Sequence, residues 1–258
     1  MGQYFDDLHA MPDSQLGGAP CLVGDSPETA EARGASDFDA LGRLAKTLDF
    51  QLRYREAIPV YGQMLSLRPD DAPTLYRLAT REINTLQPRL ALGHLTRCRE
   101  LDGDKPEYLY RIGISHYLAG DYSAAMDAEA ACFPLVDDEM GVAAMYWHTL
   151  AAWRSDAGAE LLNAFRPEMK CGHHTAYYAV MSLGAGHTAL PDFLAAAAET
   201  DSDLEYSMLA YGASVLLARG GDRRSADELR KRVIARDGFW ISYAYLAAWN
   251  DEKRKSIN

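Results

Sequence analysis

Cysteine and histidine are the first residues to consider for chemistry in this chain, because their side chains bind metals and transfer protons. The densest group is the segment Cys171-Gly-His173-His174, which could supply part of a metal site. A zinc site requires three or four ligands, and neither a C-x-x-C pair nor a second ligand cluster is visible in the sequence. We therefore expect no bound metal and no cofactor.

The histidines are not expected to be catalytic either. The chain contains seven of them, of which His94 and His116 fall within predicted helices and His187 within a predicted turn. The sequence has no Gly-x-Ser-x-Gly, P-loop or H-E-x-x-H motif. A lone histidine on a helix face is more often packed or solvated than a general base. The sequence therefore predicts a protein that is not an enzyme.

Net charge and hydropathy narrow the classes of partner. The chain of 258 residues has a formal net charge of −11, which repels nucleic acid at long range. The arginine-rich stretch 219–236 is interleaved with acidic residues, so we interpret it as a solvated helix face. No apolar run approaches the roughly 18 residues needed to cross a membrane, and Met1–Asp7 lacks the basic residues of a secretory signal. We expect a cytoplasmic protein without a nucleic-acid or membrane partner.

Small residues at a constant interval indicate how the elements pack. Ala57, Ala91, Ala125 and Ala159 follow one another at steps of 34 residues. Apolar residues between them recur at spacings of three and four, which places them on one face of a helix. A period of this length is typical of a helix–turn–helix repeat, in which a small residue lets the second helix approach the first closely. The sequence therefore predicts an all-α fold of stacked helix pairs.

Two segments resemble the tetratricopeptide repeat family: Tyr54-Arg-Glu-Ala-Ile-Pro-Val-Tyr61 and Ala119-Gly-Asp-Tyr-Ser-Ala-Ala125. The motifs Ala176-Tyr-Tyr178, Ala210-Tyr211-Gly212 and Tyr243-Ala-Tyr-Leu-Ala-Ala248 are similar to those of uncharacterised bacterial proteins of that family. The resemblance implies a right-handed superhelical solenoid of antiparallel helix pairs. It also implies a scaffold that binds proteins or peptides, and it brings no catalytic activity.

The repeat pattern suggests where the solenoid begins and ends. Repeats begin at Phe38, Ala72 and Pro106, and weaker ones follow toward the C-terminus. We predict a single solenoid over residues 37–254, with about six helix pairs and a capping helix. Residues 1–36 contain prolines and glycines with little helical periodicity, so we expect an extended or partly disordered leader.

The resemblance places the partner-binding surface in a concave groove lined by the first helix of each pair. Tyrosine at such positions offers rigid apolar area and a hydrogen-bonding hydroxyl, which suits peptide binding. Only Lys46 and Asn84 could help to bind a terminal carboxylate, so a partner held through its C-terminus is not expected. The candidate groove residues are Tyr76, Thr80, Asn84, Tyr110, Ile114, Tyr117 and His148.

Two other functions fit the same sequence. The protein could assemble with itself through a C-terminal aromatic surface made of Trp240, Tyr243, Tyr245 and Trp249. Alternatively, it could be a sensor of a small ligand or peptide, with a pocket near residues 146–178. The residues of that pocket would be Tyr146, Trp147, His148, Tyr177 and Tyr178.

Overall fold

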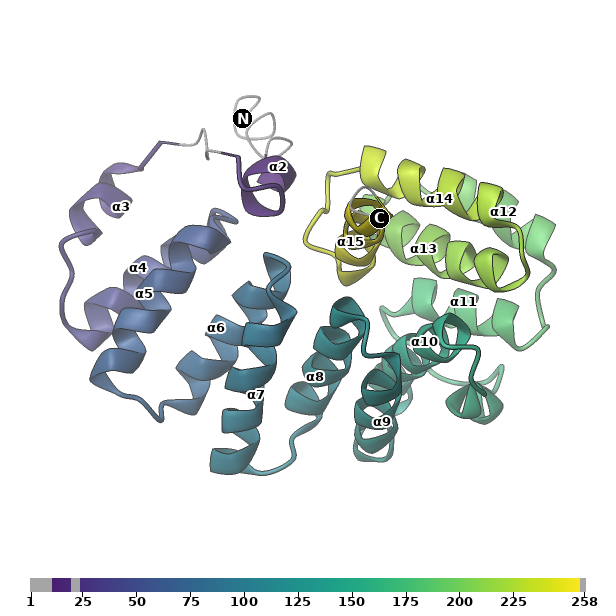
Figure 1. Ribbon diagram of the computed structural model, residues 1–258, viewed down its shortest axis with the longest axis horizontal. Helices are drawn as coiled ribbons and strands as arrows, with labels where there is room; N and C mark the ends of the chain where they lie inside the picture. Colours follow the sequence, from purple (N-terminus) through teal and green to yellow (C-terminus); the bar gives the residue numbers. More distant parts are fainter. Residues whose placement is uncertain (1–10, 20–23, 256–258) are drawn as a thin grey trace. The chain divides into compact units, whose positions relative to one another are not determined.

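The computed structural model describes residues 11–19 and 24–255. Within these ranges the chain forms helices and no β-strand (Figure 1). From residue 27 to residue 102, and again from residue 106 to residue 255, helices that follow one another in the sequence pack against one another. The predicted all-α fold of stacked antiparallel helix pairs is therefore confirmed. The prediction about Met1–Asp7 lies outside the described residues.

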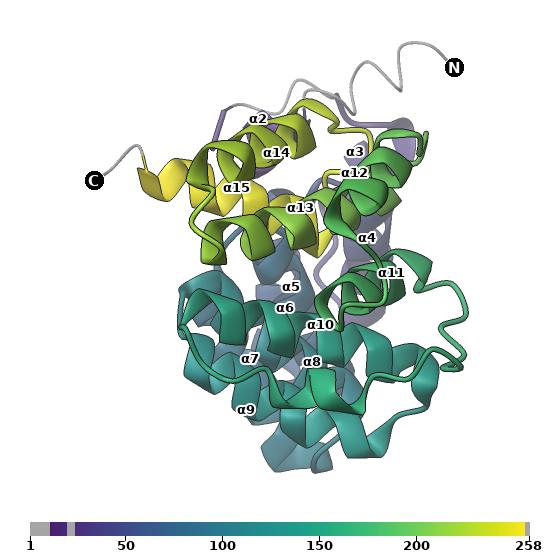
Figure 2. The ribbon, with the colours of Figure 1, turned by 90° about the vertical axis from the view of Figure 1, so that its right-hand side faces the viewer.

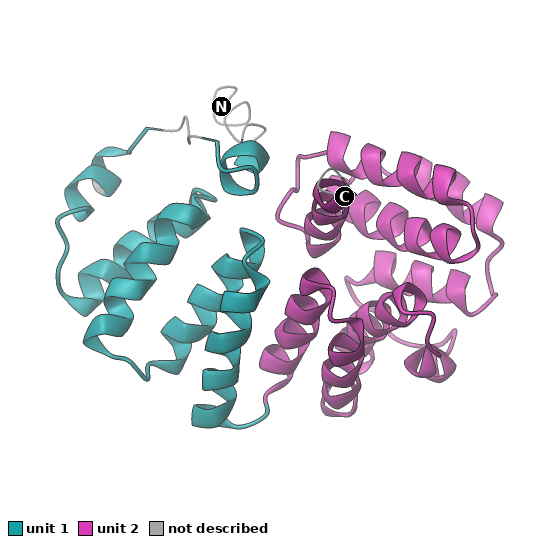
Figure 3. Ribbon diagram, in the orientation of Figure 1, with its two compact units in different colours: residues 1–104 teal, residues 105–258 magenta. Residues whose placement is uncertain are grey.

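The chain divides into two compact units (Figure 3). Unit 1 extends from Met1 to Asp104, and unit 2 from Lys105 to Asn258. The boundary falls between the second and the third predicted repeat. The extent of a single solenoid over residues 37–254 stays a prediction.

Unit 1 contains two complete helix pairs. The first helix of each pair begins after an aspartate whose side chain accepts a hydrogen bond from a backbone N–H. Asp37 accepts from Ala40 at 2.9 Å and Asp71 from Thr74 at 3.0 Å, and such caps stabilise a helix by about 1 kcal/mol. The helices are α4 (Phe38–Phe50), α5 (Tyr54–Leu67), α6 (Ala72–Asn84) and α7 (Pro88–Asp102).

The repeated alanines of unit 1 pack as predicted. Ala57 in α5 and Ala91 in α7 are both fully buried, and each lies in the second helix of its pair. Tyr61 is also buried and donates a hydrogen bond through its hydroxyl to Asp49 at 2.6 Å. The hydroxyl of this buried tyrosine therefore has a hydrogen-bond partner on the neighbouring helix α4.

The turn within each of the first three pairs places one residue in the left-handed backbone region. Leu52 and Leu86 have φ angles of 57° and 56°, and Gly120 has a φ of 89°. Each of these residues lies one repeat after the previous one. Glycine adopts this conformation freely, whereas other L-residues are strained there by about 1 kcal/mol. Unit 1 thus holds two strained leucines at a position where unit 2 has glycine.

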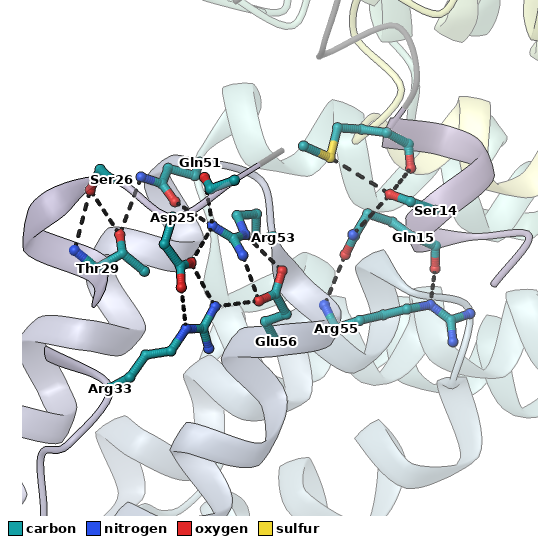
Figure 4. A network of polar contacts seen from close by, with 12 residues as sticks. Ser14, Gln15, Asp25, Ser26, Thr29, Arg33, Gln51, Arg53, Arg55 and Glu56 are labelled. Atoms are coloured by element: carbon teal, nitrogen blue, oxygen red, sulfur yellow. Dashed lines mark hydrogen bonds and ion pairs between the residues drawn. The ribbon is translucent and has the colours of Figure 1, made fainter. Parts of the chain in front are cut away.

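The described parts of residues 1–36 contain two short helices, α2 (Met11–Gln15) and α3 (Pro27–Ala32). Both are attached to the start of α5 by polar contacts (Figure 4). The backbone N–H of Arg55 donates to the side chain of Gln15 at 2.8 Å, and its guanidinium donates to the Gln15 carbonyl at 2.6 Å. The predicted limits of the leader stay a prediction.

A network of four charges joins the segment around α3 to α5 (Figure 4). Arg33 pairs with Asp25 and Glu56 at 2.6 Å each, and Arg53 pairs with the same two carboxylates at 2.9 and 2.6 Å. Hydrogen bonds from Arg33 lower the pKa of Asp25 to about 2. Burial alone raises the pKa of Glu56, but hydrogen bonds from Arg53 and Arg33 outweigh it and lower this pKa. Both carboxylates are therefore ionised at neutral pH.

Unit 2 continues the helix pairs but departs from the regular repeat. The third repeat of the chain, which is the first in unit 2, keeps the alanine contact, since Ala125 is fully buried. The elements are α8 (Pro106–Ala119), α9 (Tyr122–Cys132), η1 (Phe133–Leu135), α10 (Asp138–Arg154), η2 (Glu160–Ala164), α11 (Thr175–Gly184), α12 (Leu190–Ala198), α13 (Asp203–Arg219), α14 (Arg223–Ala235) and α15 (Tyr243–Lys255).

The predicted alanine contact at Ala159 is wrong. Ala159 is half-buried and precedes the 3-10 helix η2, rather than lying within the second helix of a pair. Gly158, Pro167 and Gly172 interrupt the stretch between α10 and α11, and glycine and proline disfavour a long helix there. Because that helix is missing, α11 packs directly against α10.

The C-terminal helix α15 packs against α13 and α14, as Figures 1 and 2 both show. Its far end also contacts α8. The side chains of Asn250 and Arg254 both donate hydrogen bonds to the carbonyl of Leu118, at 2.8 and 2.6 Å. The last helix of unit 2 therefore meets the first, and the stack closes on itself.

A polar cluster joins α8, α10, α13 and α15 inside unit 2. The hydroxyls of Tyr117 and Tyr211 lie 2.9 Å apart. Tyr211 also receives a hydrogen bond from Arg154 and donates one to Asp251, both at 3.2 Å. Arg154 and Asp251 form an ion pair in addition. These bonds satisfy polar groups that would otherwise be costly to bury.

Candidate functional site

Unit 2 contains a pocket of about 560 Å³, called here the Tyr110 pocket. Its apolar lining includes Tyr110, Met140, Tyr177, Leu204, Met208 and Tyr243. Charged and polar groups also line it: Glu107, Arg111, His173 and His174. A mostly apolar cavity of this size with a few polar groups is typical of a ligand-binding site.

The N-terminal ends of five helices supply these side chains. Glu107, Tyr110 and Arg111 lie in the first two turns of α8, where spacings of three and four place them on one face. Met140 lies in the first turn of α10, and its backbone N–H is capped by the Asp137 side chain at 3.1 Å. The remaining lining residues lie at the starts of α11, α13 and α15. The partial positive charge of helix N-termini therefore acts on the pocket.

Hydrogen bonds and ring contacts hold the pocket tyrosines in place. The indole N–H of Trp147 donates to the Tyr110 hydroxyl at 3.2 Å, and the rings of Tyr110 and Tyr243 lie 6.4 Å apart. Burial raises the pKa of Tyr110 well above its usual value, and it raises the pKa of Tyr177 to about 12. Both phenols are therefore neutral at pH 7, so they can exchange hydrogen bonds with a ligand but are poor nucleophiles.

A buried carboxyl group acts on the same tyrosines. Glu129 in α9 is fully buried, and neither of its carboxylate oxygens has a hydrogen-bond partner among the described residues. Burial raises its pKa well above the usual range, and its charge would disfavour ionisation of Tyr110 and Tyr177. A Cβ at Gly113 would overlap the Glu129 side chain. Glycine at this position therefore makes room for the glutamate.

The sequence contains a signal that indicates the unusual environment of Glu129. Glu129 occupies the repeat position of Tyr61 and Leu95, both of which are buried, and Gly113 occupies that of Ala45 and Ala79. A charged residue at a core position, facing a glycine where the other repeats have alanine, indicates that the core of the third repeat differs from those of the first two.

A third group adjoins the Tyr110 pocket and consists of Glu139, His173 and His174. One potential metal-ligating atom from each lies within 4.8 Å of the others. Nδ1 of His173 contacts the Glu139 carboxylate, and the backbone N–H of His173 donates to the same carboxylate at 3.2 Å. The ring of His174 is hydrogen-bonded through Nδ1 to the Glu139 carbonyl at 2.9 Å. Burial lowers the pKa of His174, which favours its neutral form.

The expectation of no metal depended on the lack of a third ligand beside His173 and His174. The structure places Glu139 there, although it lies one repeat length earlier in the sequence. Side chains separated by one repeat come together in a stacked fold, so this spacing could have indicated the group. Cys171, which belongs to the same sequence motif, is not part of it.

The predicted groove residues of unit 1 lie on α6. Tyr76 and Thr80 are half-buried, and the Thr80 hydroxyl donates to the Tyr76 carbonyl at 2.8 Å. Asn84 is buried and accepts a hydrogen bond from Arg81 at 3.2 Å. The structure brings these residues onto one helix. Their role in binding stays a prediction.

The predicted groove residues of unit 2 are separated by the structure. Tyr110 lines the pocket, whereas Ile114, Tyr117 and His148 are buried and do not line it. Helix α13 packs against α10 and α15 packs against α8, and Tyr211 of α13 contacts Tyr117. In this structure the three buried side chains therefore pack within unit 2, and their role in binding stays a prediction.

The residues of the two alternative functions also lie mainly in the core. Tyr146, Trp147 and His148 are buried, and of the predicted sensor residues Tyr177 lines the Tyr110 pocket. The predicted aromatic surface is covered as well. Trp240, Tyr245 and Trp249 are buried, while Tyr243 is half-buried beside the pocket.

The chain was compared with protein families, curated proteins and solved structures. No protein-family model and no curated protein matches the sequence. Two solved structures, both of the protein MamA, are similar to the chain at 15% sequence identity. One has a TM-score of 0.48 and covers 80% of this chain and 94% of its own. The other has a TM-score of 0.46 and covers 83% and 97%. Separately, no described helix is both long enough and apolar enough to cross a membrane.

Proposed function

We propose that this chain is a non-catalytic protein-interaction module that binds a short segment of a partner protein in the Tyr110 pocket. The observation that carries the proposal is the pocket itself, which combines three tyrosines with apolar side chains and a few charged groups. Its volume of about 560 Å³ suits one or two large side chains. Aromatic residues in such pockets contribute much of the affinity of protein interfaces.

The chemistry of the lining favours binding over catalysis. The raised pKa values of Tyr110 and Tyr177 keep both hydroxyls protonated, and a general base needs a pKa near the working pH. The overall charge of −11 supports a protein or peptide partner rather than a nucleic acid. The partner segment would place an apolar or aromatic side chain between the tyrosines.

The predicted groove residues Tyr76, Thr80 and Asn84 are proposed as a second contact surface, on unit 1. Ile114, Tyr117 and His148 are buried and would reach a partner only if helices of unit 2 moved apart. The proposal therefore gives the larger role to Tyr110 and to the neighbouring Tyr177 and Tyr243.

Selection of peptides from a random display library tests this proposal. Peptides enriched by the full chain should bind Tyr243→Ala about five- to thirtyfold more weakly, because a half-buried tyrosine contributes on the order of 1–2 kcal/mol to such contacts. The matched control is Tyr122→Ala, a half-buried tyrosine that does not line the pocket, which should keep the affinity. Enrichment of no peptide, or equal binding by wild type and Tyr243→Ala, would contradict the pocket as the binding site.

Sensing of a small ligand would use the same pocket, and self-assembly would need a different surface. Thermal shifts with small molecules but no peptide binding would favour the sensor. Light scattering at two protein concentrations tests self-assembly, for which the buried positions of Trp240, Tyr245 and Trp249 offer less support.

A further inference from the structure

We propose that Glu139, His173 and His174 bind a divalent transition-metal ion, and that zinc fits their donor set best. Among the described residues they form the one group of three potential ligands whose donor atoms lie within 4.8 Å of one another. Two imidazoles and one carboxylate are a combination found in zinc sites. Calcium and magnesium prefer oxygen ligands alone, so they fit less well.

The ring of His174 is fixed by a hydrogen bond to the backbone. Its Nδ1 lies 2.9 Å from the backbone carbonyl of Glu139. A carbonyl only accepts hydrogen bonds, so Nδ1 must carry the proton and Nε2 of the neutral ring has a free lone pair. Metal-binding histidines are commonly held in this way, with one ring nitrogen bonded to a carbonyl and the other on the metal.

Glu139 is also positioned before any ion binds. It lies in the first turn of α10, and its carboxylate accepts a hydrogen bond from the backbone N–H of His173 at 3.2 Å. Gly172 has a φ of 51°, and a Cβ at this residue would overlap the Glu139 carboxylate. The absence of a side chain at residue 172 therefore leaves the space that the carboxylate fills.

The group needs a small rearrangement to reach metal-binding geometry, since Nδ1 of His173 already contacts the Glu139 carboxylate. Ligand atoms at about 2.0–2.1 Å from a tetrahedral zinc lie about 3.3 Å apart, compared with at most 4.8 Å here. The side chain of His173 is 80% exposed and can move to shorten the distance. Three protein ligands leave a fourth position for water or for a bound group, and His173 and His174 place the ion at the rim of the Tyr110 pocket.

Unit 1 provides a matched control for this site. His94 forms an ion pair with Glu82 at 2.8 Å, but no third ligand completes a group there among the described residues. A simple histidine–glutamate ion pair and a metal site can therefore be told apart within one chain. The metal proposal does not depend on the proposed function, because it is tested with the metal ion alone.

Titration of the metal-free, untagged full chain tests the proposal. Calorimetry with Zn²⁺ and visible absorption with Co²⁺ should each show one equivalent bound. His174→Ala and Glu139→Gln should weaken binding at least about tenfold, since even loss of a group that only orients a ligand costs 10–100-fold. His94→Ala should bind as the wild type does, and circular dichroism should show every variant folded.

Three results would overturn the assignment. The first is the absence of stoichiometric binding to the wild-type chain. The second is unchanged binding by folded His174→Ala and Glu139→Gln. The third is loss of binding in Cys171→Ser while those two variants still bind, which would place the ion on the thiolate instead.

Discussion

Units 1 and 2 use the same helix pair in different ways, and the turn within the pair shows how. In unit 1 the left-handed turn residue is leucine, at Leu52 and Leu86, and the strain is tolerated. In unit 2 the equivalent residue is Gly120, and the guanidinium of Arg254 would lie 2.9 Å from a Cβ there. Glycine in unit 2 therefore relieves strain and also leaves room for α15.

The cores of the pairs differ in the same sense. Unit 1 has Ala45 and Ala79 beside Tyr61 and Leu95, whereas unit 2 has Gly113 beside Glu129. Unit 1 therefore retains the repeat residues for packing between neighbouring helices. In unit 2 the same positions are altered where contacts distant in the sequence, or unusual core groups, require space.

The largest difference is expected at the ion pairs. Arg154→Ala should lower the free energy of unfolding of unit 2 by about 2–4 kcal/mol, because Asp251 and Tyr211 lose a partner inside the protein. The side chains of Arg154 and Asp251 are only 22% and 11% exposed. Chemical denaturation followed by tryptophan fluorescence reports on unit 2, which contains Trp147, Trp153, Trp240 and Trp249.

The matched change in unit 1 is Arg97→Ala. Arg97 pairs with Asp70 at 2.8 Å, but the two side chains are 43% and 59% exposed. Exposed pairs contribute about 0–1 kcal/mol, so hydrogen exchange in unit 1 should change little. Equal losses from the two substitutions would contradict the assignment of a buried polar cluster to unit 2.

Glu129→Leu is expected to stabilise unit 2 by about 1–3 kcal/mol at pH 7, because it replaces an unsatisfied buried carboxyl group with the residue that unit 1 has at Leu95. The folded-state pKa of Glu129 is raised. The wild type therefore loses stability as the pH rises above about 4.3, the ordinary pKa of glutamate. Denaturation midpoints at pH 4 and pH 8 should show a gain from Glu129→Leu that grows with pH.

The reciprocal substitution, Leu95→Glu, is the control for Glu129→Leu. It should destabilise unit 1, because Ala79 does not provide the space that Gly113 gives. A destabilised Glu129→Leu variant at pH 8 would show that the carboxyl group has a partner that stabilises it.

Gly120→Ala should cost about 1–2 kcal/mol, from left-handed backbone strain and from displacement of Arg254. Thermal unfolding measures the loss, and hydrogen exchange should show α15 opening more often. Ala substitution at Leu86, which is already in the left-handed region, should leave the backbone strain nearly unchanged. An unaffected α15 in Gly120→Ala would contradict the close approach of Arg254.

The smallest expected effect is the stabilisation of the segment around α3 by Asp25 and Glu56, which is lost as the pH falls rather than as it rises. The pKa of Asp25 is lowered to about 2, and that of Glu56 is also lowered. The two carboxylates contribute fully to stability above about pH 4, which is the pKa of such groups in the unfolded chain. This contribution is lost as the pH falls through about 2. Hydrogen exchange of residues 24–36 should rise over that window, while Asp25→Asn should show faster exchange already at pH 7.

The fold could be predicted from the sequence because the small residues report a local contact. Ala57, Ala91 and Ala125 are buried between paired helices, and their spacing reveals the period. The prediction failed at Ala159, where the spacing continued but Gly158 and Pro167 disfavoured the helix that the alanine would have joined. A period alone does not reveal a missing helix.

The site could be predicted only in part. The resemblance assigns Tyr110 to a groove position, and the structure places it in the lining of the Tyr110 pocket. Tyr117 contacts Tyr211 of α13, which lies far away in the sequence, so the pattern of a single repeat could not reveal this contact. Glu139 and His173 form a group across the break in the repeat, where the sequence pattern is weakest.

The hydrogen bonds from Asn250 and Arg254 to Leu118 have a consequence for how such a protein can change in length. An open stack can gain or lose a helix pair by duplication or deletion, because each pair contacts only its neighbours. In unit 2 an added pair would carry α15 beyond the reach of α8. Insertions between residues 119 and 250 must therefore stay outside the stack, whereas the two regular pairs of unit 1 are the part of the chain where a further repeat could be accommodated.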